Sequence, residues 1–193
     1  MKSVYQTVFF GLLLLLGGCA LSPQTVSIAP VLIRPNSIKA AMAKGSRYDV
    51  ADNRGTAVVG TRGGVYADTS EITTDADVKT PMREELVSAL QAMGYRVVQA
   101  GEPADAALSV IIDTIKYSAI DKTVGKSIEI AATVRVISKV GNREYTGRYR
   151  SKRTTDVLKA PDATENEKMI DAAVSHVLER VLTDSELHTF MHS

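Results

Sequence analysis

The sequence predicts an α+β fold, a two-layer sandwich in which a mostly antiparallel sheet carries two main helices on one face, with a short C-terminal helix. Two patterns predict this class. Alternating, β-branched segments dominate residues 107–154, and the segments 80–94 and 164–181 repeat apolar residues at helical spacing. The chain has 193 residues, of which 45% are hydrophobic and 23% are charged, a composition that suits one domain with a buried core.

The first eighteen residues have the pattern of a secretory signal peptide. Lys2 gives a basic start, and Val8–Leu16 is an apolar run of 9 residues. Two glycines then precede Cys19. A membrane-spanning helix needs about 20 apolar residues, so the short run favours a cleaved signal over a permanent anchor. The alternative is an unmodified Cys19 thiol at the end of a transmembrane anchor.

The segment Leu16-Gly17-Gly18-Cys19 also resembles the bacterial lipobox. The resemblance implies that the lipoprotein processing and sorting machinery cleaves before Cys19, lipidates its sulfur and acylates the new amine. Ala20 stands where an aspartate would imply retention in the inner membrane, so the expected location is the outer membrane, facing the periplasm. One acyl chain binds a bilayer only marginally, so stable anchoring requires several chains at this cysteine.

The predicted organisation is a signal peptide at 1–18, a lipidated cysteine and tether at 19–25, and a single domain at 26–193. Cys19 is the only cysteine, which excludes an internal disulfide. Removal of residues 1–18 takes away Lys2 and no acid, so 22 of the 23 basic side chains remain beside 22 acidic ones. A domain without net charge is not expected to bind nucleic acid, and its membrane association should depend on acyl chains.

The domain is expected to begin with short strands. Prolines flank Val31–Ile33, which limits any strand there to a short or edge position. A strand from Tyr48 runs into a turn that ends at Gly55, and residues 56–60 form a second strand. The polar, acidic stretch 67–77 is predicted to be an exposed loop.

The helix ends are predicted from capping residues. In the first helix, Thr80 is the expected N-cap and Gly94 the C-terminal stop. The second helix opens with Thr164–Glu167, which has the spacing of a capping box. Asp184 or Ser185 is expected to cap a short last helix.

A strand is predicted to begin at Tyr95 directly after the first helix, and three more follow before the second helix. Residues 107–117 are apolar on parts of both faces, which indicates a central strand. Residues 127–139 alternate between apolar and polar side chains, and Gly141-Asn142 predicts a tight hairpin from there to the strand 144–154.

These features together resemble the YajG family of bacterial lipoproteins over nearly the whole chain. The matching residues are the lipobox at Cys19, the Asp52-Asn53-Arg54 turn, Met93-Gly94-Tyr95 before a strand, and Leu187–Met191 after Ser185-Glu186. These motifs are structural, so the resemblance implies a lipoprotein of the cell envelope and carries over no active site. The Asp-x-Arg turn is also similar to that of outer-membrane activators of peptidoglycan synthases.

One candidate binding site consists of Asp52 and Arg54, with Asp49 nearby. A guanidinium presents a fork of donors that fits a carboxylate or a phosphate. The alternative is that Asp52 accepts from the backbone of its own turn and pairs with Arg54.

A second candidate site lies on the last predicted strand, where Arg148, Arg150 and Lys152 share one face and the tyrosines share the other. This basic face has the chemistry to contact lipid phosphates, peptidoglycan carboxylates or an acidic protein. The alternative is an ordinary solvated sheet face, paired with Glu129 of the neighbouring strand.

Neither a metal nor a cofactor is predicted. His188 and His192 have the spacing of ligands on one helix face, but no third ligand is close in sequence. The acidic residues of 67–77 lack the glycine and the final glutamate of a calcium loop.

The sequence contains no recognisable catalytic motif. Gly-x-Ser-x-Gly, His-Glu-x-x-His and a phosphate-binding loop are all missing, and lipidation would leave no free thiol. The leading hypothesis is a non-enzymatic, lipid-anchored binding or accessory module of the cell envelope, with an envelope protein or peptidoglycan as its partner. One alternative is a regulator that docks on a peptidoglycan synthase through Asp52–Arg54 or the basic strand, and another is a cell-wall hydrolase.

Overall fold

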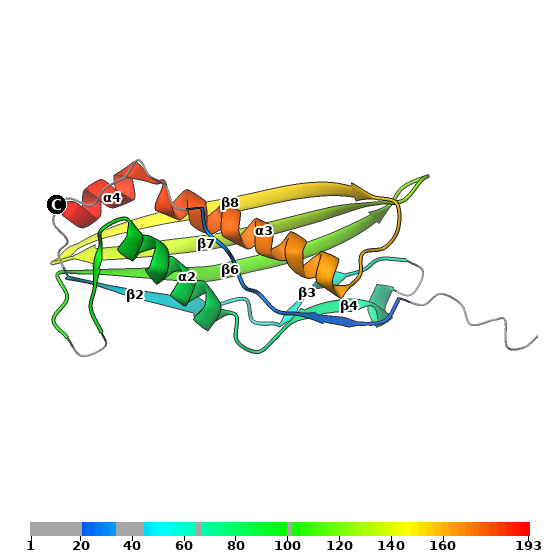
Figure 1. Ribbon diagram of the computed structural model, residues 1–193, viewed down its shortest axis with the longest axis horizontal. Helices are drawn as coiled ribbons and strands as arrows, with labels where there is room; N and C mark the ends of the chain where they lie inside the picture. Colours follow the sequence, from blue (N-terminus) through cyan, green and yellow to red (C-terminus); the bar gives the residue numbers. More distant parts are fainter. Residues whose placement is uncertain (1–20, 34–44, 65–66, 100–101) are drawn as a thin grey trace, which may run out of the picture.

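A computed structural model describes residues 21–33, 45–64, 67–99 and 102–193. Within these ranges the chain forms one open sheet of eight strands, three α-helices and a short 3-10 helix (Figure 1). The predicted α+β class is confirmed, and most of the paired strand length is antiparallel. The predicted signal peptide and Cys19 lie outside the described residues.

Three long antiparallel strands form one half of the sheet, and the last of them is an edge strand. They are β6 (Ala106–Asp121), β7 (Lys126–Val140) and β8 (Arg143–Val157). Alternation in β7 buries one row of side chains, from Ile128 at 1% exposure to Val136 at 0%. The β7–β8 turn contains Gly141 at φ 57°, a backbone conformation that glycine adopts without strain. The predicted central strand and tight hairpin are both confirmed.

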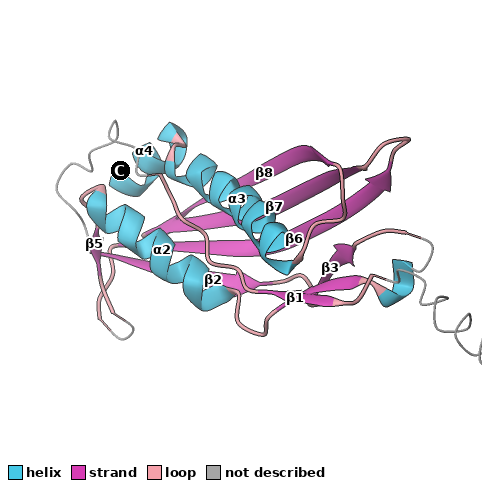
Figure 2. Ribbon diagram, turned by 45° about the vertical axis from the view of Figure 1, so that its right-hand side comes forward, coloured by secondary structure: helices cyan, strands magenta, loops and turns pink. Residues whose placement is uncertain are grey.

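Two groups of short strands share the other edge of β6 (Figure 2). β2 (Gly45–Asp52) runs parallel to the first half of β6, and β5 (Arg96–Val97) lies outside β2. Beside the second half of β6 lie, in order, β3 (Val58–Thr61), β4 (Glu71–Thr74) and β1 (Gln24–Val26). The turn that follows β2 therefore occupies the junction between the two groups.

The prediction of an exposed loop at 67–77 is wrong. This stretch contains the 3-10 helix η2 (Ala67–Thr69) and strand β4. Ile72 of β4 is fully buried, and the strand is paired on both sides. A single buried apolar residue among polar neighbours is too weak a pattern to identify such a strand.

The three helices lie on one side of the sheet in both views (Figures 1 and 2). They are α2 (Lys79–Ala92), α3 (Ala163–Leu182) and α4 (Ser185–His192). α2 packs on β2, whereas α3 packs on β7 and β8. No helix in the described ranges is long and apolar enough to cross a bilayer.

Two of the predicted helix starts are wrong by a few residues. At α2, Asp77 accepts from the backbone N–H groups of Lys79 and Thr80, so Thr80 lies inside the first turn. At α3, the capping box is formed by Asp162 and Glu165, two residues before the predicted one. Glu167, assigned to the box from sequence, instead contacts a distant segment of the chain.

That segment is Ser27–Ile33, which we call the strap. It forms no strand, and it runs extended between α2 and α3 (Figure 1). The flanking prolines predict only that any strand at residues 31–33 would be short or at an edge. Its side chains alternate, with Ile28 and Leu32 buried in the core and Val31 and Ile33 exposed. The strap therefore has the periodicity of a strand without a strand partner.

Backbone N–H groups of the strap donate hydrogen bonds to side chains of the helices. Every second N–H goes to α3, at 2.9 to 3.0 Å: Ser27 to Glu167, Ala29 to Asp171, Val31 to Ser175, and Ile33 to Glu179. Two residues of extended chain advance about 6.7 Å and four helical residues about 6 Å, so the two repeats nearly match. Leu32 donates in the other direction, to Glu85 of α2 at 2.9 Å.

The strap contacts predict a difference between two substitutions of Asp171. Burial raises the pKa of this carboxyl, and the charges of Glu167 and Asp75 raise it further, against the opposing effect of the Ala29 N–H. Ionised Asp171 therefore costs stability as the pH rises through the folded-state pKa. Asp171→Asn keeps an acceptor for Ala29 and removes the charge, so the urea midpoint at neutral pH should stay equal or rise.

Asp171→Ala is the matched variant. It removes the acceptor, and we expect a loss of about 1 kcal/mol of unfolding free energy. If the asparagine variant were destabilised as much as the alanine variant, the Ala29 hydrogen bond would not be what stabilises this position.

Candidate functional site

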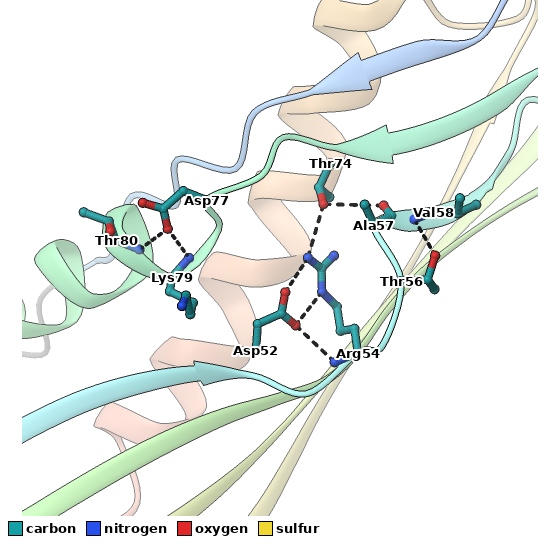
Figure 3. A network of polar contacts seen from close by, with 9 residues as sticks. All are labelled: Asp52, Arg54, Thr56, Ala57, Val58, Thr74, Asp77, Lys79 and Thr80. Carbon is teal, nitrogen blue, oxygen red and sulfur yellow. Dashed lines mark hydrogen bonds and ion pairs between the residues drawn. The ribbon is translucent and has the colours of Figure 1, made fainter.

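The Asp52–Arg54 turn lies at the junction of the two groups of short strands (Figure 3). Arg54 donates from Nε to Asp52 Oδ1 and from Nη2 to Oδ2, both at 2.8 Å, and its backbone N–H donates to the same carboxylate at 3.1 Å. Nη2 also donates to Thr74 Oγ1 of β4 at 3.2 Å. Nε and Nη2 are therefore engaged within the fold, in the arrangement of the alternative interpretation, whereas Nη1 is buried without a hydrogen-bond partner among the described residues.

The environment of this turn favours a structural role. The Arg54 side chain is only 6% exposed. Its hydrogen bond holds the pKa of Asp52 below the usual value, which keeps the carboxylate charged. Through Asp52 and Thr74, Arg54 links the end of β2 to β4 on the other side of the junction.

The sheet face opposite the helices, which we call the open face, carries the predicted basic strand. Arg148, Arg150 and Lys152 all lie exposed on it, in register with Arg135, Thr133 and Ala131 of β7. Lys152 pairs with Glu129 at 2.9 Å, and Arg135 pairs with Asp113 at 3.0 Å. Among the residues that the structure describes, Arg148 and Arg150 have no ion-pair partner.

A cavity on the open face brings the two candidate sites together. It has a volume of about 380 Å³, and its walls include Arg54 from the junction turn and Arg150 from β8. Between them lie Thr114 of β6 and Thr133 of β7, which are directly paired, and Thr133 is also paired with Arg150. Hydroxyls beside an exposed guanidinium can hold an anionic group such as a carboxylate or a phosphate.

The two predicted histidines form part of a packing cluster. Tyr95 Oη lies 2.5 Å from His188 Nδ1 and 3.1 Å from His192 Nε2, and His188 Nε2 contacts the Leu182 carbonyl at 2.7 Å. These contacts join α4 to the chain segment that follows α2. Across the described ranges no group of three or more metal-ligating side chains occurs.

The tyrosines of β8 contact a residue that the sequence analysis assigned only to a helix cap. Tyr145 donates to Asp184 Oδ2 at 2.9 Å, Tyr149 donates to the same oxygen, and Oδ1 caps α4 at Glu186 and Leu187. Burial alone would raise the pKa of Asp184, but these hydrogen bonds outweigh it and the pKa is lowered. β8 thus uses one face to hold α4 and presents its basic residues on the other.

Comparison with known proteins gives a family. The model of a protein family described as "Uncharacterized lipoprotein" matches residues 35–192 of this chain. No curated protein sequence matches the chain.

Solved structures with a similar fold come from several bacteria. A protein from Xanthomonas campestris has 9% identity and a TM-score of 0.56, over 82% of this chain and 92% of that one. A minor lipoprotein from Acinetobacter baumannii has 10% identity and a TM-score of 0.42, over 79% and 93%. A lipoprotein from Neisseria meningitidis has 12% identity and a TM-score of 0.36, over 72% and 99%. At these identities the first likeness shows the fold alone, and the other two carry no further conclusion.

The Tyr95–His188 contact predicts a pH-dependent stability. Burial lowers the pKa of His188 below 6.5, His192 lowers it further, and the contact with Leu182 opposes the shift. The unfolded chain therefore takes up the proton first, and unfolding free energy should fall as the pH drops from 6.5 toward the folded-state pKa.

His188→Gln should flatten this pH dependence while costing about 1–2 kcal/mol at neutral pH. Chemical denaturation at a series of pH values measures both effects. His176→Gln, which removes a histidine of α3 whose ring contacts Ser151, is the control and shows whether the loss of any histidine flattens the slope. An unchanged slope in His188→Gln would show that another group titrates.

Proposed function

This chain belongs to a family of uncharacterised lipoproteins, and from that premise we propose that it is a lipid-anchored, non-enzymatic accessory module of the bacterial cell envelope. The observation that carries the proposal is Cys19 directly after Leu16-Gly17-Gly18 in a chain that a lipoprotein family model matches. In the proposed organisation, residues 1–18 are removed, residues 19–25 form the lipidated tether, and 26–193 form the domain. Its likeness to the YajG family supports the same role.

The proposed location is the outer membrane, with the domain in the periplasm. Ala20 follows the cysteine, where an aspartate would favour the inner membrane. The mature domain has equal numbers of basic and acidic side chains, so covalent lipid rather than net charge would hold it.

The accessory role is supported by the open face. Arg148 and Arg150 are exposed cations without an ion-pair partner among the described residues, beside a cavity lined by hydroxyls. A peptidoglycan synthase that the protein regulates is one candidate partner, and it would bind this face through an acidic surface. The Asp52–Arg54 turn supports such docking less well, because Nε and Nη2 of Arg54 are used inside the fold and Nη1, which has no hydrogen-bond partner among the described residues, is buried. A cell-wall hydrolase has the least support, since the cavity's carboxylate, Asp113, pairs with Arg135.

The anchor is tested by metabolic labelling with palmitate. The wild-type protein should carry label and stay with the membrane after carbonate extraction, because several acyl chains hold a protein far more stably than one. Cys19→Ala should lose both properties, whereas Ser22→Ala, in the same tether, should keep them. Equal membrane retention of the wild type and Cys19→Ala, with no label in either, would contradict the proposal.

The open face is tested by charge reversal. In cells, a crosslinker should join the wild-type protein to an envelope partner, and Arg148→Glu with Arg150→Glu should reduce that product about tenfold, since the two lost surface contacts are together worth about 1.4 kcal/mol. Both residues are exposed, so the unfolding free energy should change by less than about 0.5 kcal/mol per site.

The matched control reverses two exposed lysines on the helix side, Lys79→Glu with Lys168→Glu. It changes the net charge by the same amount and should leave crosslinking intact. If both double variants lost the product equally, net charge rather than the open face would determine binding.

A further inference from the structure

The chain that connects β1 to Cys19 leaves the sheet at one of its two ends. Strand register places Gln24 of β1 level with Ile72, Gly60 and Tyr117 across β4, β3 and β6. β1 runs antiparallel to β6, so the residues before Gln24 lead toward the β6–β7 hairpin. We call this end, which contains the start of β1, the β6–β7 hairpin and the residues that follow β8, the anchor end.

Arg62 fixes the tether to the anchor end. Its side chain is buried, with the residue 8% exposed, and it donates from Nη1 to the Ser22 carbonyl at 3.0 Å. Nη2 donates to the Pro161 carbonyl, between β8 and α3, at 2.9 Å. Ser22 is therefore attached to the folded domain, and three residues of extended chain cover about 10 Å at most. A lipid on Cys19 would hold this end of the domain next to the bilayer.

The same end exposes apolar side chains. Five large apolar residues of the described ranges are exposed, and three of them lie here: Ile120 at 56%, Val124 at 73% and Leu158 at 85%. Ile120 and Val124 belong to the β6–β7 hairpin, and Leu158 follows β8. A Cβ on Gly125 would lie 3.0 Å from Leu158 Cα, so the hairpin and Leu158 are neighbours. Leu158 also lines an apolar groove of about 510 Å³ with Pro161 and Met169.

Two pairs of opposite charges lie at this end, and Lys159, which lines the same groove as Leu158, is exposed without an ion-pair partner among the described residues. Lys122 contacts Asp156 at 2.7 Å, and Lys126 contacts Asp121. The paired Lys122 and Lys126 give little attraction to anionic lipids, and Lys159 adds a single positive charge, so the apolar side chains are the main groups that favour a bilayer.

The β6–β7 hairpin and the tether extend about equally far beyond the level of Gln24. From the level of Gln24 and Tyr117, β6 continues four residues to Asp121, about 13 Å, before the turn that contains Val124. The five residues back to Cys19 span about 17 Å when extended. The hairpin tip and the lipid attachment point can therefore lie at the same depth.

We infer that the anchor end is a second membrane contact, in which Ile120, Val124 and Leu158 enter the boundary between headgroups and acyl chains of the leaflet that holds the Cys19 lipid. This inference rests on the proposed lipid anchor. The contact orients the domain with β6, β7 and β8 rising from the membrane. It places α4 and the β7–β8 hairpin, at the opposite end in Figure 1, farthest from the lipid.

The test uses single-cysteine labelling of the lipidated, full mature chain. Lipid blocks Cys19, the one native cysteine, so Val124→Cys or Leu158→Cys is the unique thiol and takes an environment-sensitive fluorophore. Asn142→Cys, exposed in the β7–β8 turn, is the matched control. Each protein is reconstituted into vesicles of phosphatidylethanolamine and phosphatidylglycerol whose acyl chains are brominated.

Labels at positions 124 and 158 should be quenched about twofold or more, and the label at 142 should not be quenched, because bromine quenches only probes at acyl-chain depth. Intact-mass measurement of each sample reports whether Cys19 carries lipid. Lipidated protein with little quenching at 124 and 158, or with equal quenching at all three sites, would overturn the second contact and leave the anchor intact. Absence of lipid on Cys19 would overturn the proposed function instead.

Discussion

The hydrogen bonds between the strap and α3 are the contacts on which the arrangement of this domain most depends. An extended segment between two helices has no strand beside it to accept from its N–H groups, so side chains of the helices take the place of a strand partner. Glu167, Asp171, Ser175 and Glu179 accept from these N–H groups at one-turn intervals, and Glu85 accepts from the other side. The strap thereby joins α2, α3 and the start of the chain into one layer over the sheet.

This layer gives the domain two different faces and two different ends. The side of the sheet covered by helices and strap holds the apolar core, whereas the open face keeps Arg148 and Arg150 exposed. At one end of the long strands, Arg62 attaches the tether to the domain. At the opposite end, His188 of α4 contacts Tyr95. In the proposed arrangement, with the anchor end beside a lipid on Cys19, a partner would meet the open face and the α4 end.

The elements with strong local patterns could be predicted from the sequence, and those that depend on distant partners could not. The three long strands, the turn at Gly141 and the start of α4 at Asp184 follow from alternation and capping chemistry. The strap could not be predicted, because Ala29 and Asp171 are 142 residues apart. Tyr95 and His188 are 93 residues apart, so the histidine spacing alone gave no sign of a tyrosine partner. The α3 capping box was misplaced because two overlapping segments fit the motif, and Glu167 is used by the strap.

Amide hydrogen exchange along the strap tests the central claim most directly. If the strap is an integral part of the helix layer, the N–H groups of Ser27, Ala29, Val31 and Ile33 should exchange slowly, with protection that approaches that of the α3 core. The backbone N–H of Gly55, in the exposed turn after β2, is the unprotected reference within the same chain. Exchange of the strap amides at the rate of that reference would contradict the account, because the strap would then open independently of α3.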